Sequence, residues 1–556
     1  MISVRLSSTL PRAAQRQWGG RLPVAVVFPE APEAALSTLG WQVVYRLLAE
    51  QDVFCVEPVF ADPASSRPRS VFTGTELGRF PLVLASLNFE GDYPALVRLF
   101  MDAGVPVSAQ ERPDWPLVMV GGPVTFLNPF PVLPAVDALW CGEAEAGFLR
   151  VAQTVAHTWV NGGGKAQALE AMAAIPGCLV PGRSPLPVRR QVTADLRTPA
   201  HSVFVSPEAR FADMFLLEVN RGCPYGCRFC AAGSIYRPAR QAPMEVLQRI
   251  VEEAAPRKVG LVGTALTDWP DLMPFLSWLR DRRAHFSLSS VRADGLSEDL
   301  LAFLRHAGVR TVTLALEGAS SRLRAAMNKG LDEDAVLRVV ATMSRLRFET
   351  LKLYLIVGWP GEEEADFKEL EAFLERIQEA RRAGQAGRAA GLKLIQLSAS
   401  ALVPKPWTAM QWAPMASLER IAAAMVRVRS MVARHRGMRF SAENARQACI
   451  QGYLARADES AFPVIVEAAE HGWGKVWRHH GAHIEAEAGR PRPVADPLPW
   501  ERLDVGVRRA YVRGQWEAFG RSRPTPACPP GSCSACRRCG MERVMGTALG
   551  VEVSQG

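Results

Sequence analysis

The sequence has no long hydrophobic run. No stretch of its 556 residues approaches the ~18 consecutive apolar residues that a membrane-spanning helix needs. The first 20 residues contain Arg and Ser but no acid, and they lack the apolar middle of a secretory signal. These absences argue against a membrane span and a secretory signal. We expect residues 1–20 to be a frayed tail, with a transit peptide as the alternative.

The charge forms no long block of one sign. The formal net charge is +9 and the pI is about 9.1, which suits an anionic partner such as RNA but equally an Arg-rich proteome. Charge alone therefore does not indicate nucleic-acid binding. Apolar residues make up 48% of a 60.8 kDa chain, enough for two large domains and one or two smaller pieces.

Cysteine is scarce, and most of it is grouped. Of the 11 cysteines, three lie within residues 223–230 and four within 528–539. Without a secretory signal, such groups indicate metal ligands in a reducing compartment rather than disulfides. We therefore expect a cytoplasmic protein.

Two series of alternating strands and helices follow one another along the chain. Strands of the first series are expected at 24–28, 53–60, 82–87, 117–120 and 138–141, and they predict a parallel, doubly wound, Rossmann-like α/β sheet. Strands of the second are expected at 215–220, 258–264, 286–291, 311–317, 352–358 and 393–400. Six βα units are too few for a closed eightfold barrel. They predict a partial (β/α)6 TIM barrel with its site at the carboxyl ends of the strands.

These patterns divide the chain into six segments. We expect a tail at 1–20, a Rossmann-like domain at 21–165, a Pro-rich linker at 166–210, a partial barrel at 211–415, a mostly helical region at 416–520 and a Cys-rich metal-binding tail at 521–556.

Three cysteines follow the first strand of the second series directly. Cys223, Cys227 and Cys230 are spaced C-x3-C-x2-C, which chance would produce about 0.004 times in such a chain. Three thiolates are one fewer than an iron–sulfur cube usually has, so one iron would stay open to a substrate. A structural zinc site is the alternative, but it would need a fourth ligand, and no His is near these cysteines in the sequence.

At this loop the sequence resembles the radical S-adenosylmethionine (radical SAM) superfamily. Phe229, just before the last Cys, and the segment GWPGE at 358–362 add to the resemblance. It implies that Cys223, Cys227 and Cys230 hold a [4Fe–4S] cluster whose fourth iron binds the methionine part of S-adenosylmethionine (SAM). It also implies reductive cleavage of SAM, with electrons from a donor such as flavodoxin or ferredoxin.

The same resemblance places further residues at the SAM pocket. A carboxylate at a strand end can accept hydrogen bonds from ribose hydroxyls or an amine, and an Arg can grip a carboxylate at two points. Ordinary buried ion pairs are the alternative reading of these charges. The expected cofactor-binding residues are Phe229, Ser290, Arg292, Glu317, Ser320, Arg322 and Gly358.

The first series resembles the cobalamin-binding-type domain found ahead of many radical SAM barrels. Together with the order of the motifs, it makes the chain resemble a largely uncharacterised family of cobalamin-binding-domain radical SAM proteins. The resemblance implies that Gly121, Gly122 and Gly142 line a cobalamin site. However, none of the nine His falls in the Asp-x-His-x-x-Gly pattern that supplies a cobalt ligand. Either cobalamin binds without a lower His, or the domain keeps the fold and has lost the cofactor.

Four cysteines close to the end of the chain form a second group. Cys528, Cys533, Cys536 and Cys539 are spaced C-x4-C-x2-C-x2-C, and two Arg lie among them. Four thiolates this close can close a tetrahedral zinc site or hold a second iron–sulfur cluster. Both alternatives stay open.

The leading hypothesis is a radical SAM enzyme that transfers a methyl group to, or rearranges, an unactivated carbon. Inert C–H bonds need a radical, and a cobalt-bound methyl group could intercept the carbon radical. One alternative is methylthiotransferase-like sulfur insertion into RNA or protein, although those enzymes carry their extra cysteines in an N-terminal domain. The other is a zinc-containing nucleic-acid-binding protein. The sequence does not indicate whether the substrate is a small molecule, an RNA or a peptide.

Overall fold

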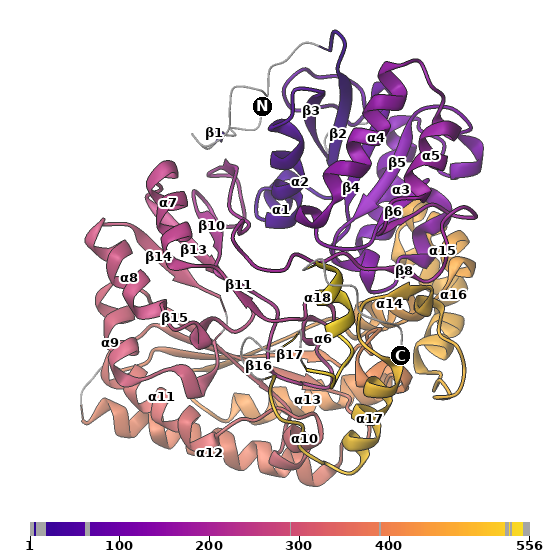
Figure 1. Ribbon diagram of the computed structural model, residues 1–556. Helices are drawn as coiled ribbons and strands as arrows, with labels where there is room; N and C mark the ends of the chain where they lie inside the picture. Colours follow the sequence, from indigo (N-terminus) through magenta and orange to yellow (C-terminus); the bar gives the residue numbers. More distant parts are fainter. Residues whose placement is uncertain are drawn as a thin grey trace.

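The architecture is that of a computed structural model (Figure 1). It describes residues 5–6, 18–61, 67–289, 291–387, 391–528, 533 and 536–548. Ser290, one of the expected cofactor-binding residues, lies outside these ranges, as does most of the expected tail at 1–20. Within the described ranges, no helix combines the length and apolarity needed to cross a membrane.

The amino-terminal domain is built on a six-stranded sheet in the order β3-β2-β4-β5-β6-β7. Its strands are parallel except for β7, which runs antiparallel to β6. The predicted parallel sheet is therefore confirmed. The strands are β2 (Leu22–Phe28), β3 (Phe54–Phe60), β4 (Leu82–Ser86), β5 (Leu117–Gly121), β6 (Ala138–Trp140) and β7 (Cys178–Leu179).

Helices cover both faces of this sheet. Because successive side chains of a strand point to opposite faces, β2 divides its apolar residues between two cores. Val24 and Val26 pack in one core with residues of α2 and α4, and Ala25 and Val27 pack in the other with residues of α3. The helices of this domain are α1 (Pro32–Ala35), α2 (Leu39–Ala49), α3 (Asp92–Ala103), α4 (Phe148–Val160) and α5 (Lys165–Ala173).

Part of the segment expected to be an irregular linker, 166–210, is regular. Helix α5 lies almost wholly within it, and β7 adds a strand to the amino-terminal sheet. The pattern missed both elements for physical reasons. The inward face of α5 carries small residues such as Ala168, and two residues are too few for a strand to show alternation.

The second series forms two parallel sheets, β10-β13-β14 and β15-β16-β17-β18. One parallel bridge, Val291 to Leu314, joins them. The six expected strands are all present. A seventh strand, β18, lies in the segment 416–520 that was expected to be mostly helical. The sequence pattern missed it because MRFSA carries too few apolar residues to indicate a strand. The strands are β10 (Phe215–Glu218), β13 (Lys258–Val262), β14 (His285–Leu288), β15 (Thr311–Glu317), β16 (Thr350–Val357), β17 (Leu394–Ala401) and β18 (Met438–Ala442).

Helices follow these strands and cover their outer side (Figure 1). Several begin at side chains that cap free backbone amides, as Ser297 does for α9 and Asp332 for α11. The helices are α6 (Ala232–Ile235), α7 (Met244–Ala254), α8 (Leu272–Asp281), α9 (Glu298–His306), α10 (Ser321–Ala326), α11 (Glu333–Arg345) and α12 (Glu364–Gln385).

The carboxy-terminal region is mostly helical, as predicted. Its helices α14 to α16 lie beside the amino-terminal domain in Figure 1, and α15 packs against α3. Asn128 of that domain donates hydrogen bonds to the carbonyls of Ala455 and Ala457, at 3.1 and 2.7 Å. The helices are α13 (Leu418–Ala433), α14 (Ala445–Arg456), α15 (Phe462–His471), α16 (Trp473–Gly489), α17 (Arg509–Gly520) and α18 (Glu542–Ala548).

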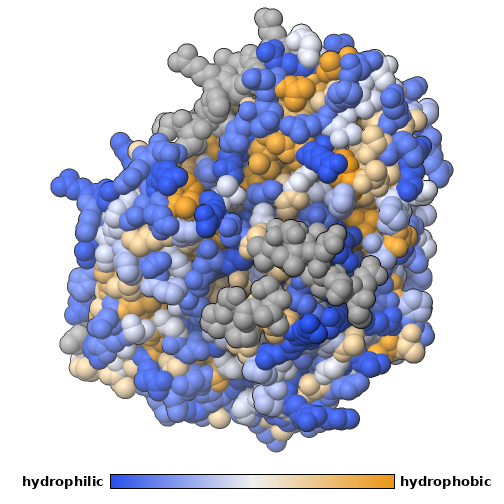
Figure 2. All heavy atoms as spheres, in the orientation of Figure 1, coloured by the Kyte–Doolittle hydropathy of each residue, from blue (hydrophilic) through white to orange (hydrophobic). Residues whose placement is uncertain are grey.

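Three pairs of short strands complete the described secondary structure. The pairs β1–β9 and β11–β12 are antiparallel, and the pair β8–β19 is parallel. Figure 2 shows hydrophilic side chains over most of the face in view, with apolar ones gathered over the amino-terminal domain. The short strands are β1 (Arg5–Leu6), β8 (Val188–Arg189), β9 (Phe204–Val205), β11 (Asn220–Arg221), β12 (Arg240–Gln241) and β19 (Leu503–Asp504).

Candidate active site

The loop of residues 222–230, here called the cluster loop, follows β11 and holds three half-buried thiols. Burial, together with the nearby thiols of Cys230 and Cys223, raises the pKa of Cys227 to about 12, although the Lys329 ammonium lowers it. The three sulfurs therefore lie within electrostatic reach of one another. Burial also raises the pKa values of Cys223 and Cys230, but backbone amides act in the other direction, with Tyr225 donating to Cys223, and Gly233 and Ala232 donating to Cys230. This donor set suits a metal cluster that binds thiolates.

No three Cys, His, Asp or Glu side chains of the described residues converge on the position of a single metal ion. This finding concerns mononuclear sites. The thiolates of a four-iron cluster each bind a different iron atom.

The cluster loop is fixed at both ends by contacts with the barrel. The Thr264 hydroxyl donates to the carbonyl of Gly222 at 2.5 Å. Arg228, which is buried, donates to the carbonyl of Ala326 at the end of α10. Phe229 meets the buried ring of Trp359 edge-on, with the ring centres 5.4 Å apart. These contacts hold the loop against the neighbouring elements.

The contact between Phe229 and Trp359 brings together two segments that the sequence singled out. Trp359 belongs to GWPGE at 358–362, which begins at the end of β16. The amide of Gly358 donates to the Glu362 carboxylate at 2.8 Å. Burial raises the pKa of Glu362 to about 7. The segment that begins at Gly358 therefore lies close to Phe229 of the cluster loop.

Arg292 and Glu317, two of the expected cofactor-binding residues, also lie beside the loop. The Arg292 guanidinium is 3.9 Å from the centre of the Tyr225 ring and pairs with Asp294 at 2.5 Å. Glu317 ends β15 with a left-handed backbone, φ 68°, and its carboxylate is 3.8 Å from the ammonium of Lys329. A non-glycine residue in that conformation costs about 1–3 kcal/mol, and such residues concentrate at functional sites.

Ser320 and Arg322 make their contacts elsewhere. Ser320 caps α10 and donates to the Asp366 carboxylate at 2.5 Å. Arg322 pairs with the same carboxylate at 2.6 Å. Both side chains therefore hold the start of α12, since Asp366 lies in its first turn.

A cavity of about 370 Å³, here called the sheet-edge cavity, runs from the carboxyl edge of the amino-terminal sheet to the cluster loop. Gly121, Gly122 and Gly142 line it at the sheet, and Gly222 lines it at the loop. No His is among its described lining residues. Most of its wall is apolar and includes Trp41, Val43, Val44, Met119, Phe126, Trp140 and Phe148.

Two of these glycines are required by the backbone itself. Gly122 and Gly142 have φ values of 104° and 145°, in a region that favours glycine. A Cβ atom on Gly122 would lie 2.4 Å from the carbonyl oxygen of Leu87, and one on Gly142 would lie 2.4 Å from that of Gln191. The edge of the cavity therefore depends on glycine at both turns.

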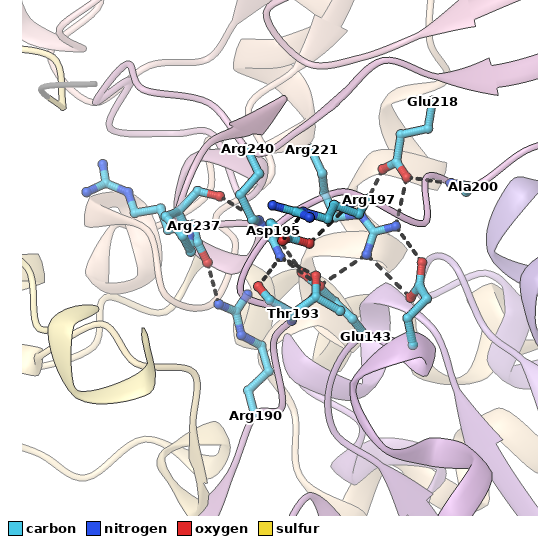
Figure 3. Close-up of polar contacts among 12 residues, drawn as sticks. Glu143, Arg190, Thr193, Asp195, Arg197, Ala200, Glu218, Arg221, Arg237 and Arg240 are labelled. Atoms are coloured by element: carbon cyan, nitrogen blue, oxygen red, sulfur yellow. Dashed lines mark hydrogen bonds and ion pairs between the residues drawn. The ribbon is translucent and has the colours of Figure 1, made fainter. Parts of the chain in front are cut away.

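A buried network of charges lies where the cavity meets the cluster loop (Figure 3). Arg221 pairs with Glu218 and Glu145 at 2.7 Å each and with Glu143 at 3.1 Å. Arg240 pairs with Glu143 at 2.6 Å. Burial raises the pKa of Glu143, but Arg240 and Arg221 outweigh it and hold this pKa well below its usual range.

This network connects the two expected cofactor regions. Glu143 and Glu145 follow β6 in the amino-terminal domain, and Arg221 is the second residue before Cys223. The sequence pattern alone predicts that Glu143 and Glu145, the acids of CGEAE, lie at the end of a strand. The pairing of Arg221 with Glu145 and of Arg240 with Glu143 could not be predicted, because these partners lie 76 and 97 residues apart in the chain.

The second group of cysteines lies beside the cluster loop. Cys528, Cys533, Cys536 and Cys539 line a cavity of about 600 Å³, here called the tail chamber. Gly222, Pro224 and Tyr225 of the cluster loop line the same chamber.

Two family models match the chain. One, described as radical SAM proteins, N-terminal, matches residues 40–181, and the other, described as the radical SAM superfamily, matches residues 217–374. Together they span more than half of the sequence. The chain belongs to the radical SAM superfamily. It is a radical SAM enzyme, and the cluster loop lies within the second matched segment.

Three similar proteins place this radical SAM enzyme among its relatives. An uncharacterised protein of Methanocaldococcus jannaschii is 24% identical over 443 residues, which are 79% of this chain and 89% of that protein. The ribosomal protein uS12 methylthiotransferase RimO of Thermotoga petrophila is 25% identical over 185 residues, 29% of this chain and 41% of that enzyme. The chain thus matches less than half of the RimO enzyme.

Among solved structures, one that this chain resembles is that of the radical SAM methyltransferase TsrM of Kitasatospora setae, with cobalamin and a [4Fe–4S] cluster bound. It aligns with a TM-score of 0.50 and 13% identity over 83% of this chain and 100% of that chain. At this identity, the likeness shows that the two share a fold.

Proposed function

We propose that this radical SAM enzyme uses cobalamin and transfers a methyl group to, or rearranges, an unactivated carbon. The observation that carries the proposal is the sheet-edge cavity, which Gly121 and Gly142 line at one end and Gly222 at the other. In doubly wound domains, ligands bind at the carboxyl ends of the strands. A cofactor held there would face the cluster loop.

The cluster loop is suited to hold the [4Fe–4S] cluster. Cys223, Cys227 and Cys230 would supply three thiolates, and the amide donors described above would stabilise the charge on Cys223 and Cys230. When bound, the cluster supplies the electron that cleaves SAM. Arg292 and Glu317 are proposed to bind SAM, because a guanidinium can hold its carboxylate and a carboxylate can accept from its amine or ribose hydroxyls.

The sheet-edge cavity is suited to hold the corrinoid. Its glycine turns let the backbone approach a ligand closely, and its apolar wall excludes water. When bound, cobalamin supplies a carrier for the methyl group. Further support comes from TsrM, which has the same fold and was solved with cobalamin and a [4Fe–4S] cluster.

Corrinoid content separates methyl transfer from the alternatives. Sulfur insertion gains support from the likeness to RimO, but this likeness covers 29% of the chain. It predicts iron–sulfur clusters without cobalt, whereas a nucleic-acid-binding zinc protein predicts zinc and no SAM cleavage.

The test is reconstitution of the full chain under anaerobic conditions with iron, sulfide and hydroxocobalamin. We expect a corrinoid spectrum and equimolar cobalt after gel filtration. Val44→Trp, which fills the sheet-edge cavity from α2, should abolish cobalt retention and leave iron unchanged. Val160→Trp is the matched control, because Val160 is 47% exposed at the end of α4. A wild-type protein that keeps its iron but retains no cobalt would contradict the proposal.

A further inference from the structure

The four cysteines near the end of the chain lie against the cluster loop. The amide of Cys528 donates a hydrogen bond to the carbonyl of Pro224 at 2.8 Å, and Pro224 is the residue after Cys223. The segment leading into this group is also anchored, because Asn328 and Thr525 exchange two hydrogen bonds of 3.0 and 2.8 Å. The second group of thiols is therefore an immediate neighbour of the first.

The four thiols of this group are neighbours of one another. Their sequence positions span only 12 residues, from 528 to 539. All four side chains line the tail chamber. A structural zinc site is closed around one ion, whereas a chamber of about 600 Å³ leaves room for a cluster of several atoms.

A buried guanidinium lies beside this group. Arg237 is 5% exposed and lines the tail chamber with the four cysteines. Its charge also acts on Cys528 and Cys533. An Arg stays charged when buried, so Arg237 offsets the negative charge of metal-bound thiolates. The net charge around an iron–sulfur cluster is one of the means by which a protein sets its potential.

We propose that Cys528, Cys533, Cys536 and Cys539 hold a second iron–sulfur cluster, which passes single electrons to the cluster at Cys223, Cys227 and Cys230. The role rests on the proposed function, whereas the site itself does not. A reduced flavodoxin or ferredoxin loses one electron to the second cluster. That electron then moves to the first cluster, where SAM accepts it.

The first test is the metal content of the full chain after anaerobic reconstitution. Wild type should hold about eight irons, and Cys533→Ala/Cys536→Ala should hold about four and give one reduced electron-paramagnetic-resonance signal instead of two. Cys178→Ala removes an isolated buried thiol in β7 and should keep the wild-type iron count. Zinc bound with about four irons in wild type, or an unchanged iron count in the double variant, would overturn the proposal.

The second test is the potential of each cluster, measured by redox titration. Arg237→Gln should shift the potential of the second cluster to more negative values, because it removes a buried positive charge beside the thiolates. The potential of the first cluster should move less. Equal shifts of both clusters, or no shift, would contradict the assignment of Arg237 to the second cluster.

The third test separates this proposal from the proposed function. With dithionite as reductant, the double variant should cleave SAM as wild type does. With reduced flavodoxin, its cleavage should fall to background. If wild type contains both clusters but cleaves no SAM with dithionite, the proposed function fails and the second site stands. If the double variant cleaves SAM normally with flavodoxin, the electron-transfer role fails.

Discussion

A single arginine, Arg221, organises the charges where the sheet-edge cavity meets the cluster loop. It faces the carboxylates of Glu143, Glu145 and Glu218 in a region from which water is largely excluded. A buried ion pair adds little over an apolar equivalent, but removal of one partner leaves an uncompensated charge. Loss of Arg221 should therefore destabilise the fold mainly because buried carboxylates would be left without a counter-charge.

We expect Arg221→Gln to lower the free energy of unfolding by about 3–5 kcal/mol, because Glu145 and Glu218 lose their buried counter-charge. Arg189→Gln is the matched control, since Arg189 is 43% exposed and pairs with Asp504 at 3.4 Å. Loss of an exposed pair costs about 0–1 kcal/mol. Urea denaturation measures both. Equal losses of unfolding free energy in the two variants would contradict the claim that the buried charge network stabilises the fold.

A second residue makes stability depend on pH. Burial raises the pKa of Asp92 to about 7, although the amides of Asn88 and Phe89 donate to its carboxylate and lower it. Because the pKa is about 4 in the unfolded chain, the protonated side chain stabilises the fold fully below about pH 4. This contribution is lost as the pH rises through about 7.

We therefore expect the stability of wild type to fall between pH 5 and 8, and that of Asp92→Asn to fall less. The expected difference in unfolding free energy is of the order of a few kcal/mol, and it should appear as a larger drop in the melting temperature of wild type. Thermal unfolding at a series of pH values measures it. Parallel pH profiles for the two proteins would show that Asp92 does not titrate in this range.

Elements that are long and apolar could be predicted from the sequence, and short or polar ones could not. Strands such as β2 and β16 have continuous or alternating apolar residues. Strand β7 has two residues and β18 carries polar residues, so neither shows a period. The cluster loop could be found from its cysteine spacing. The SAM-pocket assignments of Arg292, Glu317, Ser320 and Arg322, and the segment boundaries, stay predictions.

The turn after β5 offers a matched pair of neighbouring glycines. Gly122→Ala should lower the melting temperature clearly, because a Cβ atom would meet the Leu87 carbonyl and φ is positive. In Gly121→Ala, the nearest contact is the Cβ of Trp140 at 3.9 Å, so the change should be small. Calorimetry compares the two. A larger loss in Gly121→Ala would show that the turn is not constrained as described.

In the whole molecule, three separate segments meet at one buried carboxylate. Glu90 of the amino-terminal domain pairs with Lys405, which follows β17, at 2.6 Å. It also accepts from Gln451 of α14 at 2.9 Å. Glu90 is 2% exposed, so its partners lie in the interior of the assembly of domain, barrel and helical region.

Lys405→Met should destabilise the protein by about 3–5 kcal/mol because it leaves the Glu90 carboxylate buried without a counter-charge. The double variant Glu90→Gln/Lys405→Met should recover part of that loss, since no charge is then buried. Denaturation of the single and double variants forms a double-mutant cycle. Additive losses would contradict a direct coupling between the amino-terminal domain and the barrel.

The proposed cleavage of SAM depends on a cluster held by the three thiols of the cluster loop. The most direct measurement is SAM cleavage by the reconstituted chain with dithionite under anaerobic conditions. We predict 5′-deoxyadenosine or S-adenosylhomocysteine from wild type and from Cys449→Ala, which removes an isolated buried thiol, and neither product from Cys227→Ser. Iron-loaded wild type that forms neither product, or Cys227→Ser that forms them at the wild-type rate, would contradict it.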